Sequence, residues 1–236
     1  MTHEELAKYI DISVLKPDIT RKEIAGKIDA ALHYPFASIC IPPSHVAFAF
    51  KRIDGRPLKV TTVVGFPFGY QTKETKIAEA KQAVSEGATE LDLVMNMSFF
   101  KSGEAFLVEE EIREVVEIVP VALVKVIIEC AYLNYKEKTY ALEMAINGGA
   151  RFIKTATGYG PGVATTEDVK LLKEFAGDRI NIKTAGGIND LDAALELIRA
   201  GTDRIGTSAG IKMVEELKER NFPTPKEEPE GPIEES

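Results

Sequence analysis

The stretch "INGGARFIKTATG", residues 146–158, contains the unit from which this chain is built. A helix-like segment ends at paired glycines, the apolar run "RFIKTAT" (151–157) follows, and a further glycine closes the stretch. Glycine is favoured after a helix because the chain there often needs a positive φ. Nearly continuous apolar runs are typical of parallel strands that are covered on both faces. The stretch therefore predicts a helix end, a tight turn and a buried parallel strand.

The same order recurs along the chain, as in "SEGATELDL" (85–93) and "RAGTDRIGT" (199–207). The pattern predicts strands at 11–15, 36–41, 58–65, 90–96, 122–129, 151–157, 180–185 and 203–208. Amphipathic helices are predicted from a capping box at Thr20 and Glu23, and over 73–86, 104–118, 136–147, 166–176, 190–200 and 210–220. Eight such units favour a closed (β/α)₈ TIM barrel of the α/β class. An open doubly wound sheet is the alternative, although no glycine-rich dinucleotide motif follows the first strand.

The end of the chain differs in composition from the rest. The segment 221–236 has five Glu and one Lys, and so holds −4 of the formal net charge of −8. It is rich in proline and cannot bury enough apolar surface to order itself. We therefore predict a single barrel domain over residues 1–220 and an acidic, disordered tail over 221–236.

Composition argues against several classes of partner. The chain shows no clustered basic stripe, which nucleic-acid binding would need. It has no apolar run long enough to span a membrane, and its start lacks the apolar segment of a signal peptide. Cys40 and Cys130 provide neither a disulfide framework nor metal-ligand spacing. We expect a cytoplasmic protein without a metal, a cofactor, a nucleic-acid partner or a membrane anchor.

Two lysines occupy matching places in "FIKTATG" (152–158) and "NIKTAGG" (181–187). Lys154 and Lys183 fall near the C-terminal ends of predicted strands, where barrel enzymes carry their functional residues. Like charges a few ångströms apart lower the pKa of one amine, which frees it to attack a carbonyl. Structural ion pairs are the alternative explanation. Asp92, inside the apolar run "ELDLVMN" (90–96), is predicted to transfer protons or to pair with a lysine. Lys125, placed near the start of its strand, is predicted to be a structural ion-pair member.

Three glycine-bearing turns follow the last three predicted strands: "TATGYGPG" (155–162), "AGGIND" (185–190) and "IGTSAG" (205–210). The second and third lead directly into helices, whose first backbone N–H groups bind anions. Barrels frequently hold phosphate in the loops after strands seven and eight. The turns therefore predict a phosphorylated substrate.

At this point the motifs resemble those of the deoxyribose-phosphate aldolase family. The resemblance covers roughly residues 8–215 and rests on "DISVLKP" (11–17), "VVGFPFGYQTKETKIAEAKQAVSEGA" (63–88) and the successive strand motifs "ELDLVMN", "LVKVIIE", "FIKTATG", "IKTAGGI" and "RIGTS". It implies a (β/α)₈ class I aldolase that uses no metal. Such an enzyme reversibly cleaves 2-deoxy-D-ribose 5-phosphate to acetaldehyde and D-glyceraldehyde 3-phosphate through a lysine Schiff base.

The resemblance also implies residue roles. Lys154 matches the Schiff-base lysine, Lys183 its activating partner and Asp92 the proton-relay aspartate. Substrate-binding positions are matched by Asp11, Ser13, Cys40, Gly158, Gly186, Gly187, Gly206 and Ser208. This chain departs from the family pattern at Ile12, Pro42 and Ala209, and the last of these loses a possible hydroxyl donor to phosphate. Its tail has no tyrosine, so proton transfer would rest on Asp92, Lys183 and water.

Two rival interpretations remain. One is a different Schiff-base barrel, such as a transaldolase or a sugar-bisphosphate aldolase. The other is a non-catalytic barrel that binds a sugar phosphate, although mere phosphate binding needs no buried lysine pair. We expect a small phosphorylated sugar as substrate and a homo-oligomer, either a dimer or a tetramer.

Overall fold

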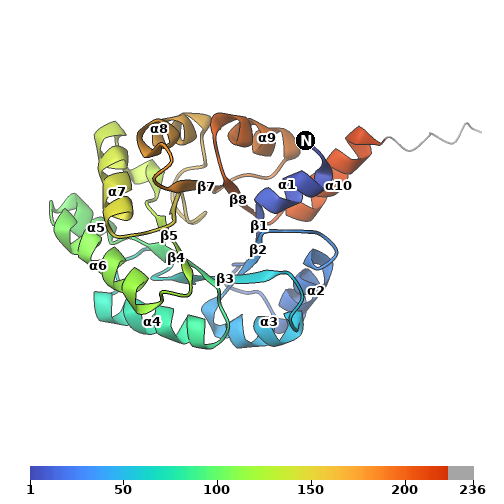
Figure 1. Ribbon diagram of the computed structural model, residues 1–236, viewed down its shortest axis with the longest axis horizontal. Coiled ribbons are helices and arrows are strands. Elements are labelled where there is room, and N and C mark those ends of the chain that lie inside the picture. The colour runs from blue at the N-terminus through green and yellow to red at the C-terminus, as the bar shows by residue number, and fades with distance from the viewer. Residues whose placement is uncertain (223–236) are drawn as a thin grey trace, which may run out of the picture.

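Parallel strands close into a barrel in the computed structural model, which describes residues 1–222 (Figure 1). The eight strands are β1 (Ile10–Ser13), β2 (Ser38–Ile41), β3 (Lys59–Val64), β4 (Glu90–Val94), β5 (Leu123–Ile127), β6 (Phe152–Lys154), β7 (Asn181–Ala185) and β8 (Arg204–Thr207). Strand β1 pairs with both β2 and β8, so the sheet is closed. The (β/α)₈ barrel is therefore confirmed, and the open-sheet alternative is wrong.

Each strand leads to a helix on the outside of the ring (Figure 1). These helices are α2 (Arg21–Ala31), α3 (Val46–Ile53), α4 (Lys73–Ser85), α6 (Ala105–Ile118), α7 (Tyr135–Asn147), α8 (Thr166–Ala176), α9 (Leu191–Ala200) and α10 (Gly210–Asn221). The repeated glycines that follow α4, α7 and α9 have positive φ: 109° at Gly87, 81° at Gly149 and 113° at Gly201. They reverse the chain from each helix into the next strand, as the repeat predicted.

Short elements depart from the predicted pattern. Helices α1 (His3–Tyr9) and α5 (Met97–Lys101) and the helix α3 were not predicted. Two 3₁₀ turns, η1 (Pro43–His45) and η2 (Cys130–Tyr132), follow β2 and β5. A capping box between Thr2 and Glu5 starts α1, which packs against α10. Five to eight residues form too few helical turns for a periodic apolar pattern to stand out.

Side chains on the strands alternate between two environments, because successive residues in a strand point to opposite faces. Leu91 and Leu93 pack in the apolar layer beneath the helices, while Asp92 between them lies in the barrel with other charged groups. Val124 and Val126 flank Lys125 in the same way. Barrel interiors are usually filled by branched apolar residues. Here the interior holds a charged layer, which must be internally paired to be stable.

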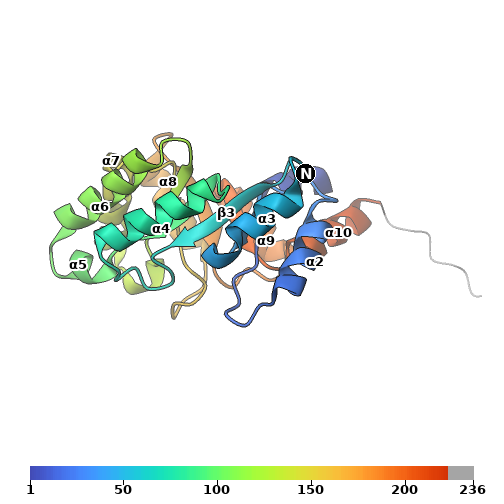
Figure 2. The same ribbon diagram turned by 90° about the horizontal axis from the view of Figure 1, so that it is seen from below.

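The strand register places this layer beneath the loops at one end of the barrel. Lys154 lies beside Lys183 across the β6–β7 pair, and Asp92 lies beside Lys125 across β4–β5. The loops after β1 and β6 project from the same side of the barrel, the lower side in Figure 2. This end of the barrel is therefore the place to look for a site.

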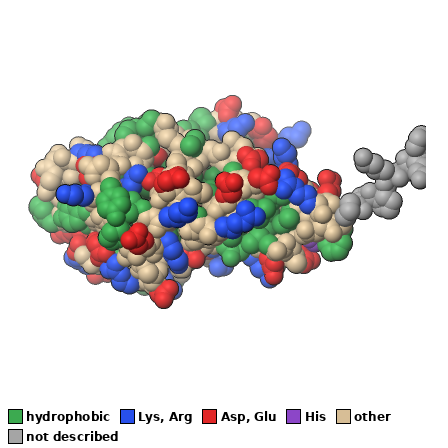
Figure 3. Space-filling model, turned by 90° about the horizontal axis from the view of Figure 1, so that it is seen from above, with side chains coloured by type: hydrophobic (Ala, Val, Ile, Leu, Met, Phe, Trp, Pro, Cys, Tyr) green, Lys and Arg blue, Asp and Glu red, His purple; other side chains and the backbone are tan. Residues whose placement is uncertain are grey.

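The outer surface carries acidic and basic side chains interspersed on the face shown in Figure 3. Along residues 1–222, no helix is both long and apolar enough to cross a membrane. The predicted disordered tail begins at 221, where α10 ends, and its residues 223–236 lie outside the part of the chain that the structure describes.

Candidate active site

Asp92 lies at the centre of the charged layer and binds three lysines. Lys154 Nζ donates to Asp92 Oδ2 at 2.8 Å, and Lys183 Nζ donates to the same oxygen at 2.7 Å. Lys125 Nζ donates to the other oxygen, Oδ1, at 3.0 Å. The structure thus brings together Lys154, Lys183 and Asp92, which sequence motifs on three separate strands predicted as partners.

The two lysines that flank Asp92 Oδ2 differ in their other partners. Lys183 Nζ forms a second ion pair with Asp11 Oδ2 at 2.7 Å, and both side chains are fully buried. Asp11 in turn accepts from Ser38 Oγ at 2.6 Å and from the guanidinium of Arg204. Lys154 pairs with Asp92 alone among the described carboxylates. One ammonium is therefore held by two carboxylates and the other by a shared one.

The buried charges of this cluster do not balance. Lys125, Lys154, Lys183 and Arg204 face three carboxylates, which belong to Asp11, Glu90 and Asp92. One cation is in excess when every group is ionised. Loss of a proton from one lysine would neutralise the cluster, and an uncompensated buried charge is costly. The lysine with the fewest carboxylate partners is the one expected to lose it.

The pKa values of the groups follow this pairing. Burial lowers the pKa of Lys154, and the positive charge of Lys183 adds to that effect, although Asp92 opposes it. Burial would also lower the pKa of Lys183, but Asp11 and Asp92 outweigh burial and raise it. Burial would raise the pKa of Asp92, but the three lysines hold it well below its usual range. The site therefore favours loss of a proton from Lys154 rather than from Lys183, and it keeps Asp92 ionised.

Lys125 is the third of the five residues of β5 rather than near the strand's start. Besides Asp92 it pairs with Glu90 at 2.7 Å, and its side chain is fully buried. Its predicted place in an ion pair is observed. The partner is the same aspartate that binds Lys154, so Lys125 also helps to fix that carboxylate.

Lys154 opens into a cavity of about 210 Å³ at the C-terminal end of the barrel. The predicted residues that line this cavity are Lys154, Ser13, Gly158, Gly186, Gly187, Gly206 and Ser208. Lys183, Asp92 and Asp11 are fully buried beneath it. Cys40 is also buried away from the cavity lining, and burial raises the pKa of its thiol to about 12. Asp11 and Cys40 were predicted to bind substrate, but they lie behind the residues that line the cavity.

Gly206 is needed where the cavity meets the charged layer. A Cβ at this position would lie 3.0 Å from Ala185 Cβ and 3.3 Å from Lys183 Cε. Both distances are tighter than ordinary van der Waals contact, so a side chain here would push on the lysine. The absence of a side chain at Gly206 keeps the space in which Lys183 is positioned.

The two helices that start beside the cavity differ in their capacity for an anion. The side chain of Asp190 caps α9 by accepting from the Ala193 N–H at 2.9 Å. No side chain caps α10, which begins at Gly210 after Ala209. Unpaired N–H groups at a helix start attract anions. A capping carboxylate occupies one of these N–H groups, and its negative charge repels an anion. The start of α10 is therefore the better anion site.

Several cavity residues were missed by the motif analysis. Thr157 and Tyr159 follow β6, Asn189 follows β7, and Lys16 follows β1. Each stands inside or next to a motif that was quoted for its glycines or lysines. A signal was present in the motif, but a loop side chain's direction depends on backbone angles that a sequence pattern does not give.

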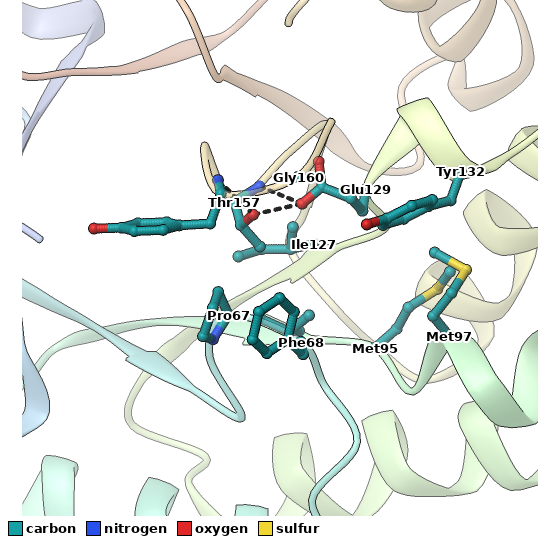
Figure 4. Close-up of a pocket in the computed structure, with 11 residues that line it drawn as sticks. Pro67, Phe68, Met95, Met97, Ile127, Glu129, Tyr132, Thr157 and Gly160 are labelled. Atoms are coloured by element: carbon teal, nitrogen blue, oxygen red, sulfur yellow. Dashed lines mark hydrogen bonds between the residues drawn. The ribbon is translucent and has the colours of Figure 1, made fainter. Parts of the chain in front are cut away.

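Glu129 was missed as well, and it positions the loop after β6 (Figure 4). It has a positive φ of 46°, which is uncommon for a residue other than glycine and a pointer to function. Its Oε2 accepts from both the N–H and the hydroxyl of Thr157. A Cβ at Gly160 would lie 2.6 Å from the Glu129 carboxyl carbon, so glycine permits this close approach. Glu129 thereby ties the end of β5 to the loop that lines the cavity.

Within residues 1–222, no group of three or more His, Cys, Asp or Glu side chains is arranged to hold a metal ion. Carboxylates do gather in the charged layer, but lysine and arginine side chains occupy their oxygens.

Comparisons with known proteins show the family of the chain. Residues 6–215 match the sequence model described as DeoC/LacD family aldolase. A deoxyribose-phosphate aldolase from Caldanaerobacter subterraneus subsp. tengcongensis is 48% identical over 220 residues, which cover 92% of this chain and 95% of that protein. A solved aldolase called QR15 superposes with a TM-score of 0.89 at 42% identity, covering 93% of this chain and 99% of that one. A tetrameric deoxyribose phosphate aldolase from Aeropyrum pernix has a TM-score of 0.86 at 29% identity, with 92% of each chain covered.

Proposed function

Since the chain belongs to the DeoC/LacD family of aldolases, we propose that it cleaves 2-deoxy-D-ribose 5-phosphate reversibly to acetaldehyde and D-glyceraldehyde 3-phosphate. The chain is an aldolase and hence a lyase, as its family and its relatives show. One observation carries the proposed mechanism. Lys154 has a lowered pKa, shares its carboxylate with Lys183 and opens into a cavity lined by glycine turns.

The reaction starts at Lys154. Its neutral amine attacks the C1 aldehyde of the open-chain sugar phosphate, and loss of water from the carbinolamine gives an iminium ion. Removal of the proton from the C3 hydroxyl then breaks the C2–C3 bond, and the iminium accepts the electron pair. D-Glyceraldehyde 3-phosphate leaves, and an enamine remains on Lys154. Protonation of the enamine carbon and hydrolysis release acetaldehyde and restore the amine.

Asp92 and Lys183 fit the proton transfers because their pKa values are shifted in opposite directions. Asp92 stays ionised and can accept a proton, whereas Lys183 stays charged and can donate one. Lys183 donates to Asp92 Oδ2, the same oxygen that accepts from Lys154. A water molecule would complete the path between this pair and the substrate carbon. Environments that drive two pKa values apart are typical of acid and base partners.

The phosphate group would bind at the glycine turns that line the cavity. Gly158, Gly186, Gly187 and Ser208 line this part of it, and the uncapped start of α10 follows Ser208 and Ala209. Backbone N–H groups at such a position bind phosphate oxygens well. The side chains of Asn189 and Ala209 supply neither a charge nor a hydroxyl. Neutral donors of the glycine turns therefore make most of the contacts with the phosphate.

Turnover of deoxyribose 5-phosphate, followed by reduction of the released glyceraldehyde 3-phosphate in a coupled assay, tests the proposed function. Incubation with acetaldehyde and borohydride should add a two-carbon group to Lys154. A label chiefly on Lys183 would reverse the assignment of the two lysines. Turnover of a dihydroxyacetone donor instead of acetaldehyde would favour a transaldolase or sugar-bisphosphate aldolase. Phosphate binding without turnover or adduct would favour the non-catalytic barrel.

Metal independence is part of the proposal. An amine that forms an iminium ion supplies its own electron sink, so no Lewis acid is needed. Activity should be unchanged after dialysis against a chelator. Loss of activity that a divalent ion restores would contradict the class I mechanism.

We also propose that the chain assembles with copies of itself in the cytoplasm. A tetrameric relative supports assembly, and the two buried free thiols, Cys40 and Cys130, suit a reducing compartment. Light scattering coupled to gel filtration would give the mass of the assembly. A mass near 25.9 kDa at working concentration would show a monomer.

A further inference from the structure

The loop between β1 and α2 carries a lysine at the edge of the active-site cavity. Lys16 lines this cavity together with Gly158, Gly187 and Ser208. Its side chain is exposed, and it forms no salt bridge with any residue of 1–222. The acidic residues that follow it in the sequence, Asp18 and Glu23, therefore form no direct ion pair with it. Lys16 is a cation at the edge of a cavity that offers a site for an anion.

A contact across the barrel mouth fixes the position of this loop. The hydroxyl of Tyr159, from the loop after β6, donates to the backbone carbonyl of Leu15 at 2.7 Å. The Tyr159 ring also packs edge-on against Phe66, with 5.4 Å between centroids. Burial raises the pKa of Tyr159, so its hydroxyl remains a donor at neutral pH. The residue next to Lys16 is thus anchored to the loop that carries Thr157 and Gly158.

Lys16 can supply the positive charge that a bound phosphate needs. Two cations from residues 1–222 line the cavity, Lys16 and Lys154. Lys154 must be neutral to attack a carbonyl, and Lys183 beneath it is already paired with Asp11 and Asp92. A phosphate group carries between about one and a half and two negative charges at neutral pH. The glycine turns and Ser208 offer neutral donors, which leave that charge without a counter-ion.

We propose that Lys16 recognises the phosphate charge and makes the enzyme select phosphorylated over unphosphorylated sugars, with Tyr159 positioning it through Leu15. This inference rests on the proposed cleavage of deoxyribose 5-phosphate. It assigns specificity to a residue on β1–α2, whereas the backbone donors that hold the phosphate come from the loops after β6, β7 and β8. The charge contact and the backbone cradle would thus approach the phosphate from two sides.

The test compares two substrates in matched variants. Lys16→Met should raise KM for deoxyribose 5-phosphate about tenfold, the loss expected for one charge-assisted hydrogen bond, while kcat changes little. The kcat/KM for unphosphorylated 2-deoxyribose should change less than about twofold, because an uncharged end needs no counter-ion. Lys16→Arg should keep most of the phosphate preference. Lys22→Met, which removes another exposed lysine from the start of α2, should leave both substrates unaffected.

Tyr159→Phe tests the positioning contact. It removes the hydroxyl that bonds to Leu15 and keeps the ring against Phe66. KM for the phosphorylated sugar should rise by a few-fold, in the same direction as for Lys16→Met and without a matching change for 2-deoxyribose. In the Lys16→Met background the same substitution should add little. An unchanged KM in Tyr159→Phe would overturn the positioning role.

Other outcomes separate this inference from the proposed function. An equal loss of kcat/KM for both sugars in Lys16→Met would show a general role in the loop and overturn the inference. If the wild-type protein turns over neither sugar, the proposed function fails. The affinity for inorganic phosphate, measured by titration calorimetry, then still tests Lys16 without turnover. Weaker phosphate binding by Lys16→Met than by Lys22→Met would support it, and equal affinity would overturn it.

Discussion

Two buried lysines in this molecule both have a pKa that burial lowers, but their surroundings differ. Burial lowers the pKa of Lys76, on α4, and of Lys154, on β6. Lys76 donates to Glu111 of α6 at 2.6 Å and to the backbone carbonyl of Val94 at 2.9 Å. Lys154 shares one oxygen of Asp92 with Lys183. Lys76 is therefore the only lysine of residues 1–222 that binds its carboxylate, whereas Lys154 shares its carboxylate with Lys183.

The comparison shows that burial and a lowered pKa do not by themselves identify a catalytic lysine. Structural ion pairs also perturb pKa values. Lys76 and Glu111 form a balanced pair between two helices and the end of β4, away from the cavity that Lys154 opens into. Lys154 belongs to a cluster with one cation in excess and reaches a space where a substrate fits. Unequal pairing and access distinguish Lys154, the proposed reactive amine, from Lys76.

The largest expected effect comes from Lys154→Leu. Turnover should fall on the order of 10⁴-fold or more, as when other enzymes lose their nucleophile. Trapping of acetaldehyde by borohydride should disappear at every pH. The fold should persist, because three cations and three carboxylates remain in the cluster, and thermal unfolding checks this. Adduct formation that survives the substitution would place the reactive amine elsewhere.

Lys183→Leu should have the next largest effect. Loss of its positive charge leaves Asp92 and Asp11 with less compensation, so the pKa of Lys154 should rise. The protonated amine then persists to higher pH, and turnover near neutrality should fall by about 10²–10⁴-fold, the range for a general acid or base. Borohydride trapping should still occur but should require higher pH than in the wild type.

Lys125→Met is the matched control for Lys183→Leu. It also removes a buried cation from Asp92, but that cation binds Oδ1, whereas Lys154 and Lys183 share Oδ2. The pH profile of adduct formation should therefore move less than in Lys183→Leu. If the Lys183→Leu profile overlays the wild type, Lys183 serves in proton transfer or in a structural ion pair and not in activation.

Most of the barrel could be predicted because its signals are local and repeated. The glycines after α4, α7 and α9 and the apolar runs that follow them recur along the chain, and the strand and helix order follows from them. The proximity of Lys154 and Lys183 could be predicted for the same reason, since both lysines stand in copies of one motif. The predicted strands overran their C-terminal ends, as at 155–157, because the apolar run continues into the loop that lines the cavity.

The pairing within the site could not be predicted from sequence. Asp11 and Asp92 are 81 residues apart in the chain, and their contacts with Lys183 depend on closure of the barrel between β1 and β8. The same closure gives Lys183 its second carboxylate and therefore decides which lysine keeps its proton. Sequence reasoning assigned the lowered pKa mainly to the neighbouring positive charge, whereas burial is the larger cause. Lys76 was missed altogether, because its helix has no repeated motif.

Lys76→Met tests the structural side of the comparison. It leaves Glu111 buried without its partner, so the free energy of unfolding should fall by about 3–5 kcal/mol. Denaturant unfolding measures this loss. Lys73→Met is the control on the same helix, since Lys73 pairs with Glu114 at the partly exposed surface and should cost no more than about 1 kcal/mol. Under conditions where Lys76→Met stays folded, kcat should be unchanged; a specific loss of kcat would connect Lys76 to catalysis.

The smallest expected effect comes from replacing both members of the pair, as Lys76→Met with Glu111→Leu. Apolar side chains of similar volume often replace a buried ion pair at no net cost, because the desolvation of both charges is avoided. The free energy of unfolding should therefore return to within about 1 kcal/mol of the wild-type value, since the Val94 carbonyl loses only one donor. A double-mutant cycle would show strong coupling between the two positions. The matching replacement in the barrel, Lys154→Met with Asp92→Leu, should restore no turnover, because a balanced charge does not replace an amine. The contrary outcome is that the two substitutions at Lys76 and Glu111 lower the free energy of unfolding additively. That result would show that these charges have partners beyond each other, and that Lys76 and Lys154 are more alike than their contacts indicate.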